Sequence, residues 1–180
     1  MAVADICASL GRAADAELDA ALPVLIRRAA DTNVFIVEAA DAALASAVLH
    51  CSEARVVAAL LTASAHKQPN IRLHAAPWLD RAVSRIPPAR LGGLRDLERV
   101  VGAAARYLCE GSPEVRYAGH RLLATLRRAG AVDDRYLGRA VPERLLARVR
   151  EVLAKGAPPA DPFVWPAEGG GGGAGSARRE

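Results

Sequence analysis

Apolar residues recur at helical spacing along most of the chain, so each segment has one face to bury. This periodicity predicts helices over residues 3–14, 17–30, 34–50, 53–65, 70–85, 93–109, 114–129 and 142–155, with a short helix over 134–140. Almost no segment shows the alternation of polar and apolar residues that a half-buried strand requires. The pattern therefore predicts an all-α fold.

Polar and helix-breaking residues at the ends of these segments give the predicted boundaries a chemical basis. Asn33, Asn70 and Ser112 each stand near the start of an apolar run, where their side chains are able to accept hydrogen bonds from free first-turn amides. Gly130 follows such a run and is expected to end a helix. Pro77 lies inside a predicted helix, where it is expected to cause a kink.

Three of the predicted helices share one design, seen in NVFIVEAADAAL from residue 33, PNIRLHAAPWL from 69 and PEVRYAGHRLL from 113. In each copy a branched apolar residue precedes a leucine by eight positions, which places both on the same helical face. These pairs are Ile36 and Leu44, Ile71 and Leu79, and Val115 and Leu123. Another amphipathic helix precedes each copy, so the repeating unit is a helix, a short polar turn and a second helix.

Stacked helix pairs of this kind form an α-solenoid of HEAT-type repeats, because one pair alone cannot bury its apolar stripe. In two copies an arginine, Arg72 or Arg116, directly follows the branched residue and is expected to point away from the core, toward neighbouring turns or solvent. We expect this domain to span residues 1–155. Residues 156–180, Pro-rich and then Gly-rich, are predicted to form a disordered tail.

The composition fits this fold and narrows the class of protein. Hydrophobic residues make up 52% of the chain and aromatic residues only 4%, so the core must be aliphatic. No apolar run is long enough to span a bilayer, and the first residues lack the features of a secretory signal. We therefore expect a soluble, intracellular protein that is not anchored in a membrane. Three widely spaced cysteines, Cys7, Cys51 and Cys109, are expected to be buried reduced thiols.

The net charge of +4 conceals an uneven distribution along the chain. Residues 1–50 carry 3 basic and 7 acidic groups, whereas residues 51–155 carry 19 and 10. The second segment suits an acidic partner, and charge alone leaves open whether this is a nucleic acid, an anionic membrane or an acidic protein surface. Solvated arginines on outer helix faces are the alternative explanation.

The sequence contains no arrangement of residues typical of catalysis. The GGGGG run has neither a preceding strand nor a following helix with the Lys-Ser/Thr pair of a phosphate-binding loop. His50 and Cys51 are adjacent and point to different sides of a helix. His66 and His74 match no compact metal-ligand spacing with the cysteines. We therefore predict no enzymatic activity, no cofactor and no bound metal.

Three stretches carry a resemblance to a known family: DTNVFIVEAADAAL over 31–44, HKQPNIR over 66–72 and EGSPEVRYAG over 110–119. They resemble successive pieces of a TOG domain, a HEAT-repeat module that binds tubulin. They are most similar to the TOG array regulators of axonemal microtubules, also called the crescerin family. The resemblance covers roughly residues 3–140 and implies that the chain is the C-terminal part of such a domain.

The resemblance also implies that the turns within the helix pairs face tubulin along one edge. The candidate contact residues are Asp31, Thr32 and Asn33 at the first turn, His66, Lys67, Gln68, Asn70 and Arg72 at the second, and Ser112, Glu114 and Arg116 at the third. The charge of Lys67 suits an acidic tubulin surface. Phe35 and Ile36 are expected to pack in the core instead of touching a partner.

The resemblance implies a tubulin- or microtubule-binding module that acts in microtubule organisation, in the cytoplasm and cytoskeleton and within a cilium or flagellum. Its partner is expected to be tubulin or microtubules and not a nucleic acid, and the module itself is expected to be monomeric. The alternative is a HEAT-repeat scaffold without tubulin binding, whose concave or basic surface holds another protein or a nucleic acid.

Overall fold

The computed structural model describes residues 3–156 and residue 158, and this part of the chain contains helices and no strand. The predicted tail over 156–180 lies outside the described residues, apart from residues 156 and 158. The elements are α1 (Val3–Leu10), the 3-10 helix η1 (Gly11–Ala14), α2 (Asp15–Ala29), α3 (Val34–His50), α4 (Glu53–Ser64), α5 (Pro69–Ser84), α6 (Pro88–Leu91), α7 (Leu97–Tyr107), α8 (Pro113–Arg128), α9 (Asp134–Ala140) and α10 (Glu143–Ala154).

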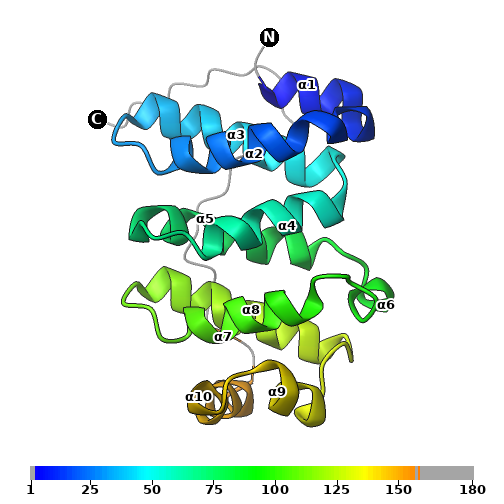
Figure 1. Ribbon diagram of the computed structural model, residues 1–180, viewed down its shortest axis with the longest axis vertical. Coiled ribbons are helices and arrows are strands. Elements are labelled where there is room, and N and C mark those ends of the chain that lie inside the picture. Colours follow the sequence, from blue (N-terminus) through cyan, green and yellow to red (C-terminus); the bar gives the residue numbers. More distant parts are fainter. Residues whose placement is uncertain (1–2, 157, 159–180) are drawn as a thin grey trace, which may run out of the picture.

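The helices stack in pairs along one long axis (Figure 1). Helices α2 and α3 form the first of the repeating pairs, α4 and α5 the second, and α7 and α8 the third, with α1 packed on α3 at one end and α9 and α10 at the other. Between pairs, α2 contacts α4 and α4 contacts α7, while α3 contacts α5 and α5 contacts α8. The first and second helices of the pairs thus form two layers, and the chain is the predicted all-α solenoid of HEAT-type repeats.

Local side-chain chemistry explains several helix ends that the sequence predicted correctly. The Asn33 side chain accepts a hydrogen bond from the Phe35 amide at 3.0 Å, at the start of α3. The Ser112 hydroxyl accepts from the Val115 amide at 3.4 Å, at the start of α8. Gly130, just past the end of α8, has a φ of +68°, a conformation that glycine adopts without steric cost.

Two predicted boundaries are wrong. Asn70 does not cap α5, because the helix begins at Pro69 and Gln68 occupies the cap position. Proline favours the first position of a helix, since its ring fixes a helical φ and it has no amide to satisfy. The helix predicted over 93–109 begins only at Leu97, after the short helix α6, which the sequence did not predict.

The core confirms the repeat register. The buried repeat positions are Leu44, Ile71, Leu79, Val115 and Leu123, which are all between 0% and 4% exposed. Ile36 is only half-buried, so the prediction that it packs in the core holds in part. The apolar core is continuous from α1 to α10, as expected when each pair covers the stripe of its neighbour.

Polar side chains also join consecutive pairs. The Trp78 indole on α5 donates to Asp41 Oδ1 on α3 at 3.0 Å. The Tyr107 hydroxyl on α7 hydrogen-bonds the buried Ser64 hydroxyl on α4, and burial raises the pKa of Tyr107 to about 12. The phenol therefore keeps its proton at neutral pH, and both contacts fix the position of one pair relative to the next.

The cysteines confirm the expectation of burial at two positions and contradict it at the third. Cys7 and Cys51 are buried, and desolvation together with the neighbouring Cys7 thiol raises the pKa of Cys51 to about 12. Cys109 is exposed, because it follows the end of α7 and lies in the connection to α8. All three are free cysteines.

Helices α7 and α8 approach each other closely at Gly119, and replacing this residue by alanine is expected to destabilise the fold. A Cβ atom at this position would lie 2.7 Å from the Ala104 carbonyl oxygen and 2.8 Å from the Tyr107 Cβ. Because both neighbours belong to rigid parts of α7, the two helices must move apart. We expect a loss of about 1–3 kcal/mol in the free energy of unfolding, measured by chemical denaturation.

Gly102 on α7 provides the matched control. A Cβ at Gly102 would meet only the Arg106 Nη1 atom, at 3.6 Å, and alanine favours a helix over glycine. Gly102→Ala is therefore expected to leave the stability unchanged or to raise it. An equal effect of both substitutions would contradict close packing at Gly119.

Candidate protein-interaction edge

The turns within the three repeating pairs line up along one side of the solenoid, at the left in Figure 1. They join α2 to α3, α4 to α5 and α7 to α8. We call this side the turn edge and define it by residues 30–35, 65–70 and 108–114. Since the first turn of the following helix belongs to it, the turn edge presents both loop and helix-start side chains.

Two arginines hold the backbone of the second and third turns. Arg72 Nη1 donates to the carbonyl oxygens of His66 at 3.0 Å and Lys67 at 3.1 Å. Arg116 Nη1 donates to the carbonyl oxygens of the two residues at the same sequence spacing, at 2.8 and 2.7 Å. The arginine that follows the branched residue thus turns back from the helix and satisfies two turn carbonyls. This explains why PNIR and PEVR repeat, and it confirms that both arginines point to neighbouring turns.

Glu110 connects these two turns, and sequence reasoning missed it. Its carboxylate accepts from Arg72 Nε at 3.2 Å, and its carbonyl is one of the two held by Arg116. The Arg72 and Glu110 side chains are 25% and 32% exposed, so the ion pair is partly shielded from water. No local spacing relates residues of different pairs, and only the stacking brings them together. The second and third turns are therefore held as one unit.

The first turn is held by a different device, because Val37 stands where the other copies have arginine. Asp31 Oδ1 accepts from the Asn33 amide at 3.1 Å, and Asp31 Oδ2 lies 3.4 Å from Arg28 Nη1. The Asn33 amide is the main cause that lowers the pKa of the Asp31 carboxyl, so this group is negative at neutral pH. The Thr32 side chain remains exposed at the tip.

The candidate contact residues lie in these three turns, except Arg72 and Arg116, which lie in the first turns of α5 and α8. Their exposure divides the candidates into two groups. The exposed residues are Thr32, Asn33, His66, Lys67, Gln68, Asn70 and Glu114. The half-buried residues are Asp31, Arg72, Ser112 and Arg116. Each of the half-buried side chains holds a turn or a helix start through the hydrogen bonds given above. The Lys67 ammonium makes no ion pair with any residue of the described ranges.

The prediction that Phe35 packs in the core is wrong. Its side chain is 81% exposed, and that of the preceding Val34 is 64% exposed. Phe35 is the second residue of α3, a position that faces outward at the turn edge. The sequence pattern assigned this residue to the core because it is apolar, whereas the backbone position decides its exposure.

A cleft of about 450 Å³ separates the first and second turns on this edge. Its lining joins the end of α2, with the basic Arg27, to the turn before α5 and the start of that helix: Arg27, Ala30, Gln68, Pro69, Asn70 and Ile71. The cleft is therefore part of the turn edge and places a basic group beside the exposed polar residues.

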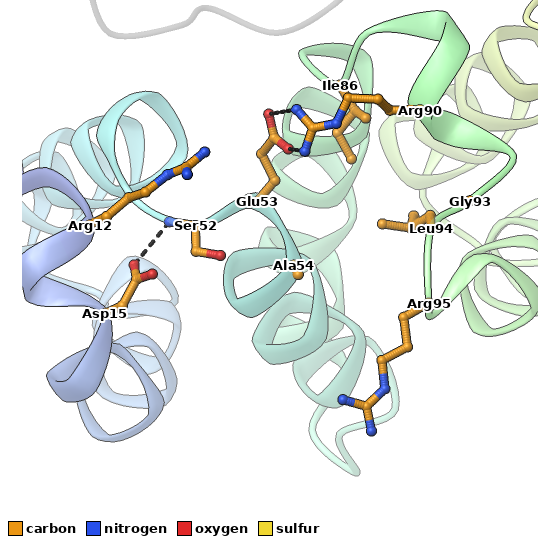
Figure 2. Close-up of a pocket in the computed structure, with 10 residues that line it drawn as sticks. All are labelled: Arg12, Asp15, Ser52, Glu53, Ala54, Ile86, Arg90, Gly93, Leu94 and Arg95. Carbon is orange, nitrogen blue, oxygen red and sulfur yellow. Dashed lines mark hydrogen bonds and ion pairs between the residues drawn. The ribbon is translucent and has the colours of Figure 1, made fainter.

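A second depression, of about 600 Å³, lies on the opposite edge, where consecutive pairs are joined (Figure 2). The Asp15 carboxylate accepts from the Ser52 amide at 2.9 Å, and Glu53 binds Arg90 at 2.6 Å. These acidic groups are bonded within the chain, so the depression offers no free carboxylate pair for acid–base chemistry.

Residues 3–156 and residue 158 form neither a cluster of metal ligands nor a membrane-spanning helix. No group of three or more His, Cys, Asp or Glu side chains there is placed to hold a metal ion. None of the helices there is both long and apolar enough to cross a membrane.

Much of the basic surplus of the chain lies at the end formed by α8, α9 and α10. Part of it is used in ion pairs: Arg127 binds Asp134 in a bidentate contact at 3.0 and 3.1 Å. The Glu151 carboxylate forms ion pairs with Arg148 Nη1 and Lys155 Nζ, both at 2.7 Å. These basic groups are therefore compensated by carboxylates of the same chain and need no external partner.

These features define a class: a HEAT-repeat solenoid in which the turns of the helix pairs line up along one edge and are held in place by hydrogen bonds. Residues 1–121 match the family model described as CLASP N terminal, and the chain belongs to this family.

The chain is also similar to a protein that is named for its role at microtubules. The chain is 30% identical over 150 residues to the mouse (Mus musculus) TOG array regulator of axonemal microtubules protein 1. This match covers 82% of the chain and 8% of the relative, so the chain spans a small part of that protein. The resemblance to TOG array regulators that the sequence indicated is thereby confirmed.

A solved structure described as "Structural Basis of Microtubule Plus End Tracking by XMAP215, CLIP-170 and EB1" has the same fold. It superposes with a TM-score of 0.62 at 20% sequence identity, over 86% of this chain and 64% of the solved chain. At this identity the likeness establishes the fold of the chain and nothing finer.

Proposed function

We propose that the chain is a tubulin- or microtubule-binding module without enzymatic activity, and that it binds through the turn edge. The observation that carries the proposal is the identical arginine contact in the second and third turns. These contacts hold the backbone of the two turns, and the exposed side chains of the turns remain accessible to a partner. A pre-organised edge loses little conformational freedom on binding.

The family and the names of the relatives support tubulin as the partner. The mouse relative is named as a regulator of axonemal microtubules, and the solved structure concerns microtubule plus-end tracking. On the basis of this similarity we propose that the module acts in the cytoplasm and cytoskeleton and in a cilium or flagellum. We further propose that it acts as a monomer, that residues 1–155 form the binding domain, and that neither nucleic acid nor membrane is its partner.

The proposed contact residues are the exposed ones of the turn edge: Thr32, Asn33, His66, Lys67, Gln68, Asn70 and Glu114. Asp31, Arg72, Ser112 and Arg116 are proposed to position them. Glu114 is negative at neutral pH, because the Ser112 hydroxyl lowers its pKa.

Co-sedimentation with polymerised microtubules, combined with size-exclusion chromatography against free tubulin, tests the proposal. We expect binding in at least one of the two assays at modest salt. Absence of binding in both would refute the proposal and favour a HEAT-repeat scaffold for another protein.

Lys67→Glu is expected to raise the Kd for tubulin by about three- to tenfold, mainly through slower association, and less at high salt. The substitution places a negative charge against an acidic surface. Helicity and the unfolding midpoint should not change, because the fold uses the Lys67 carbonyl and not its side chain. Binding kinetics at two salt concentrations measure the effect, and a variant that binds like the parent protein would exclude Lys67 from the contact.

Arg72→Glu provides the contrast on the same turn. This change removes the guanidinium that donates to two turn carbonyls and to the Glu110 carboxylate. It also places a second carboxylate next to that of Glu110, and the two repel each other. It should therefore lower the unfolding midpoint as well as any binding. Equal stability loss in both variants would place Lys67 within the scaffold.

A further inference from the structure

The three second helices begin in the same register, which identifies three equivalent positions on the turn edge. Phe35, Asn70 and Glu114 are each the second residue of their helix, and each directly precedes the branched residue of the repeat. All three side chains are exposed. The repeat thus directs this position outward in every pair, and Phe35 belongs to the same row as Asn70 and Glu114.

The Phe35 ring is presented from a fixed backbone. Its amide donates to the Asn33 side chain at 3.0 Å, and the Asn33 amide donates to Asp31 at 3.1 Å. The helix start is therefore determined by hydrogen bonds that do not involve the ring. An exposed aromatic side chain on a rigid element is the kind of residue that anchors protein interfaces, since it buries a large area at a small entropic cost.

The surface of α3 around Phe35 is also apolar. Val34 is 64% exposed, and Ala39 and Ala42, which lie one and two turns further along the same helical face, are exposed as well. Glu38 is the one charged residue among the exposed positions from 34 to 42. Such a face is unusual for an outer helix surface, which in solenoid repeats is normally polar.

The charges beside this face indicate the chemistry of its partner. Lys67 stands exposed on the next turn without an ion pair in the described part of the chain, and Arg27 lines the cleft between the two turns. A surface that covers both must offer an apolar depression with acidic groups at its rim. We propose that Phe35 is the apolar anchor of the turn edge and inserts into such a depression on tubulin, next to acidic groups that face Lys67. This inference rests on the proposed function and adds a contact residue to it.

Binding of the full chain to soluble tubulin and to microtubules tests the inference in four variants: Phe35→Ala, Phe35→Leu, Lys67→Glu and Leu10→Ala. Leu10, at 54% exposure, is a matched apolar control. It precedes Gly11, which lies against the His50 carbonyl at the opposite end of α3 from Phe35. Unfolding midpoints and sedimentation of the free chain are measured alongside.

We expect Phe35→Ala to raise the Kd by about tenfold or more, with an unchanged dependence on salt and an unchanged unfolding midpoint. Phe35→Leu should lose less affinity, and Leu10→Ala none. The affinity of the Lys67→Glu variant should depend less on salt than that of the parent chain, whereas the salt dependence of Phe35→Ala should not change. This difference separates the charged contact from the apolar one.

Three results would overturn the inference. If Phe35→Ala binds like the parent while Lys67→Glu binds more weakly, the proposed function stands and Phe35 is not an anchor. If the parent chain sediments as a dimer that Phe35→Ala dissociates, a second copy and not tubulin covers this face. If the parent binds neither tubulin nor microtubules, the proposed function fails and the inference fails with it.

Discussion

Arg121→Leu is expected to lower the free energy of unfolding by about 3 kcal/mol, the lower end of the cost of removing one partner of a buried ion pair, because the Arg121 side chain is 25% exposed. Arg121 on α8 forms an ion pair with Asp80 on α5, and the Asp80 side chain is 0% exposed. The substitution leaves the carboxylate in the interface between two helix pairs without its guanidinium. It also removes the cation from the Tyr117 ring, whose centre lies 6.0 Å from the Arg121 guanidinium carbon. Urea denaturation followed by circular dichroism measures the loss.

Two comparison variants show whether the loss arises from burial of the charge. Arg55→Leu breaks an ion pair with Asp19 of 2.7 Å, but these side chains are 44% and 70% exposed, so both groups stay hydrated and little stability should be lost. The double variant Asp80→Leu with Arg121→Leu removes both charges and is expected to recover much of the stability lost by Arg121→Leu alone. A single variant no worse than Arg55→Leu would contradict a buried pair.

Leu123→Ala is expected to cost about 2–5 kcal/mol, because the removed atoms leave a cavity that a rigid helix interface fills only in part. Leu123 is 0% exposed on α8, and Leu79, its repeat equivalent on α5, is also 0% exposed. The two helices belong to consecutive pairs and contact each other. Thermal and urea unfolding give the size of the effect, and Leu79→Ala should behave similarly.

Val24→Ala on α2 is the control for this core substitution. Val24 is 49% exposed, so shortening it removes little buried surface and should change the stability only slightly. If Leu123→Ala were as mild as Val24→Ala, the repeat register deduced from the spacing of eight residues would be wrong.

Which segments form helices, and where several of these helices begin, was predictable because the causes lie within each segment. Apolar spacing marks the face that a helix must bury, and a cap forms between residues two or three positions apart. Asn33 and Ser112 therefore defined two helix starts from the sequence alone. At α5 two local signals competed, and the first-position preference of Pro69 prevailed over the capping ability of Asn70.

The sequence predicted which residues lie in the turns of the turn edge, but it did not predict the ion pairs between different helix pairs. The repeat spacing and the family resemblance placed the candidate residues in three turns. The bond between Arg72 and Glu110 joins residues 38 positions apart, and the pair of Asp80 and Arg121 joins different helix pairs in the same way. No periodic pattern within one helix contains such information.

The sequence by itself determined the helices, the repeat register and most of the buried leucines, because these follow from spacing and capping within one segment. Only the tertiary structure decided which apolar residues are covered and which ions pair. Burial is a property of a position relative to its neighbours, and none of the helices that the structure describes covers Phe35 at the start of α3. The same apolar character that places Leu123 between two helix pairs therefore leaves Phe35 in solvent on the turn edge.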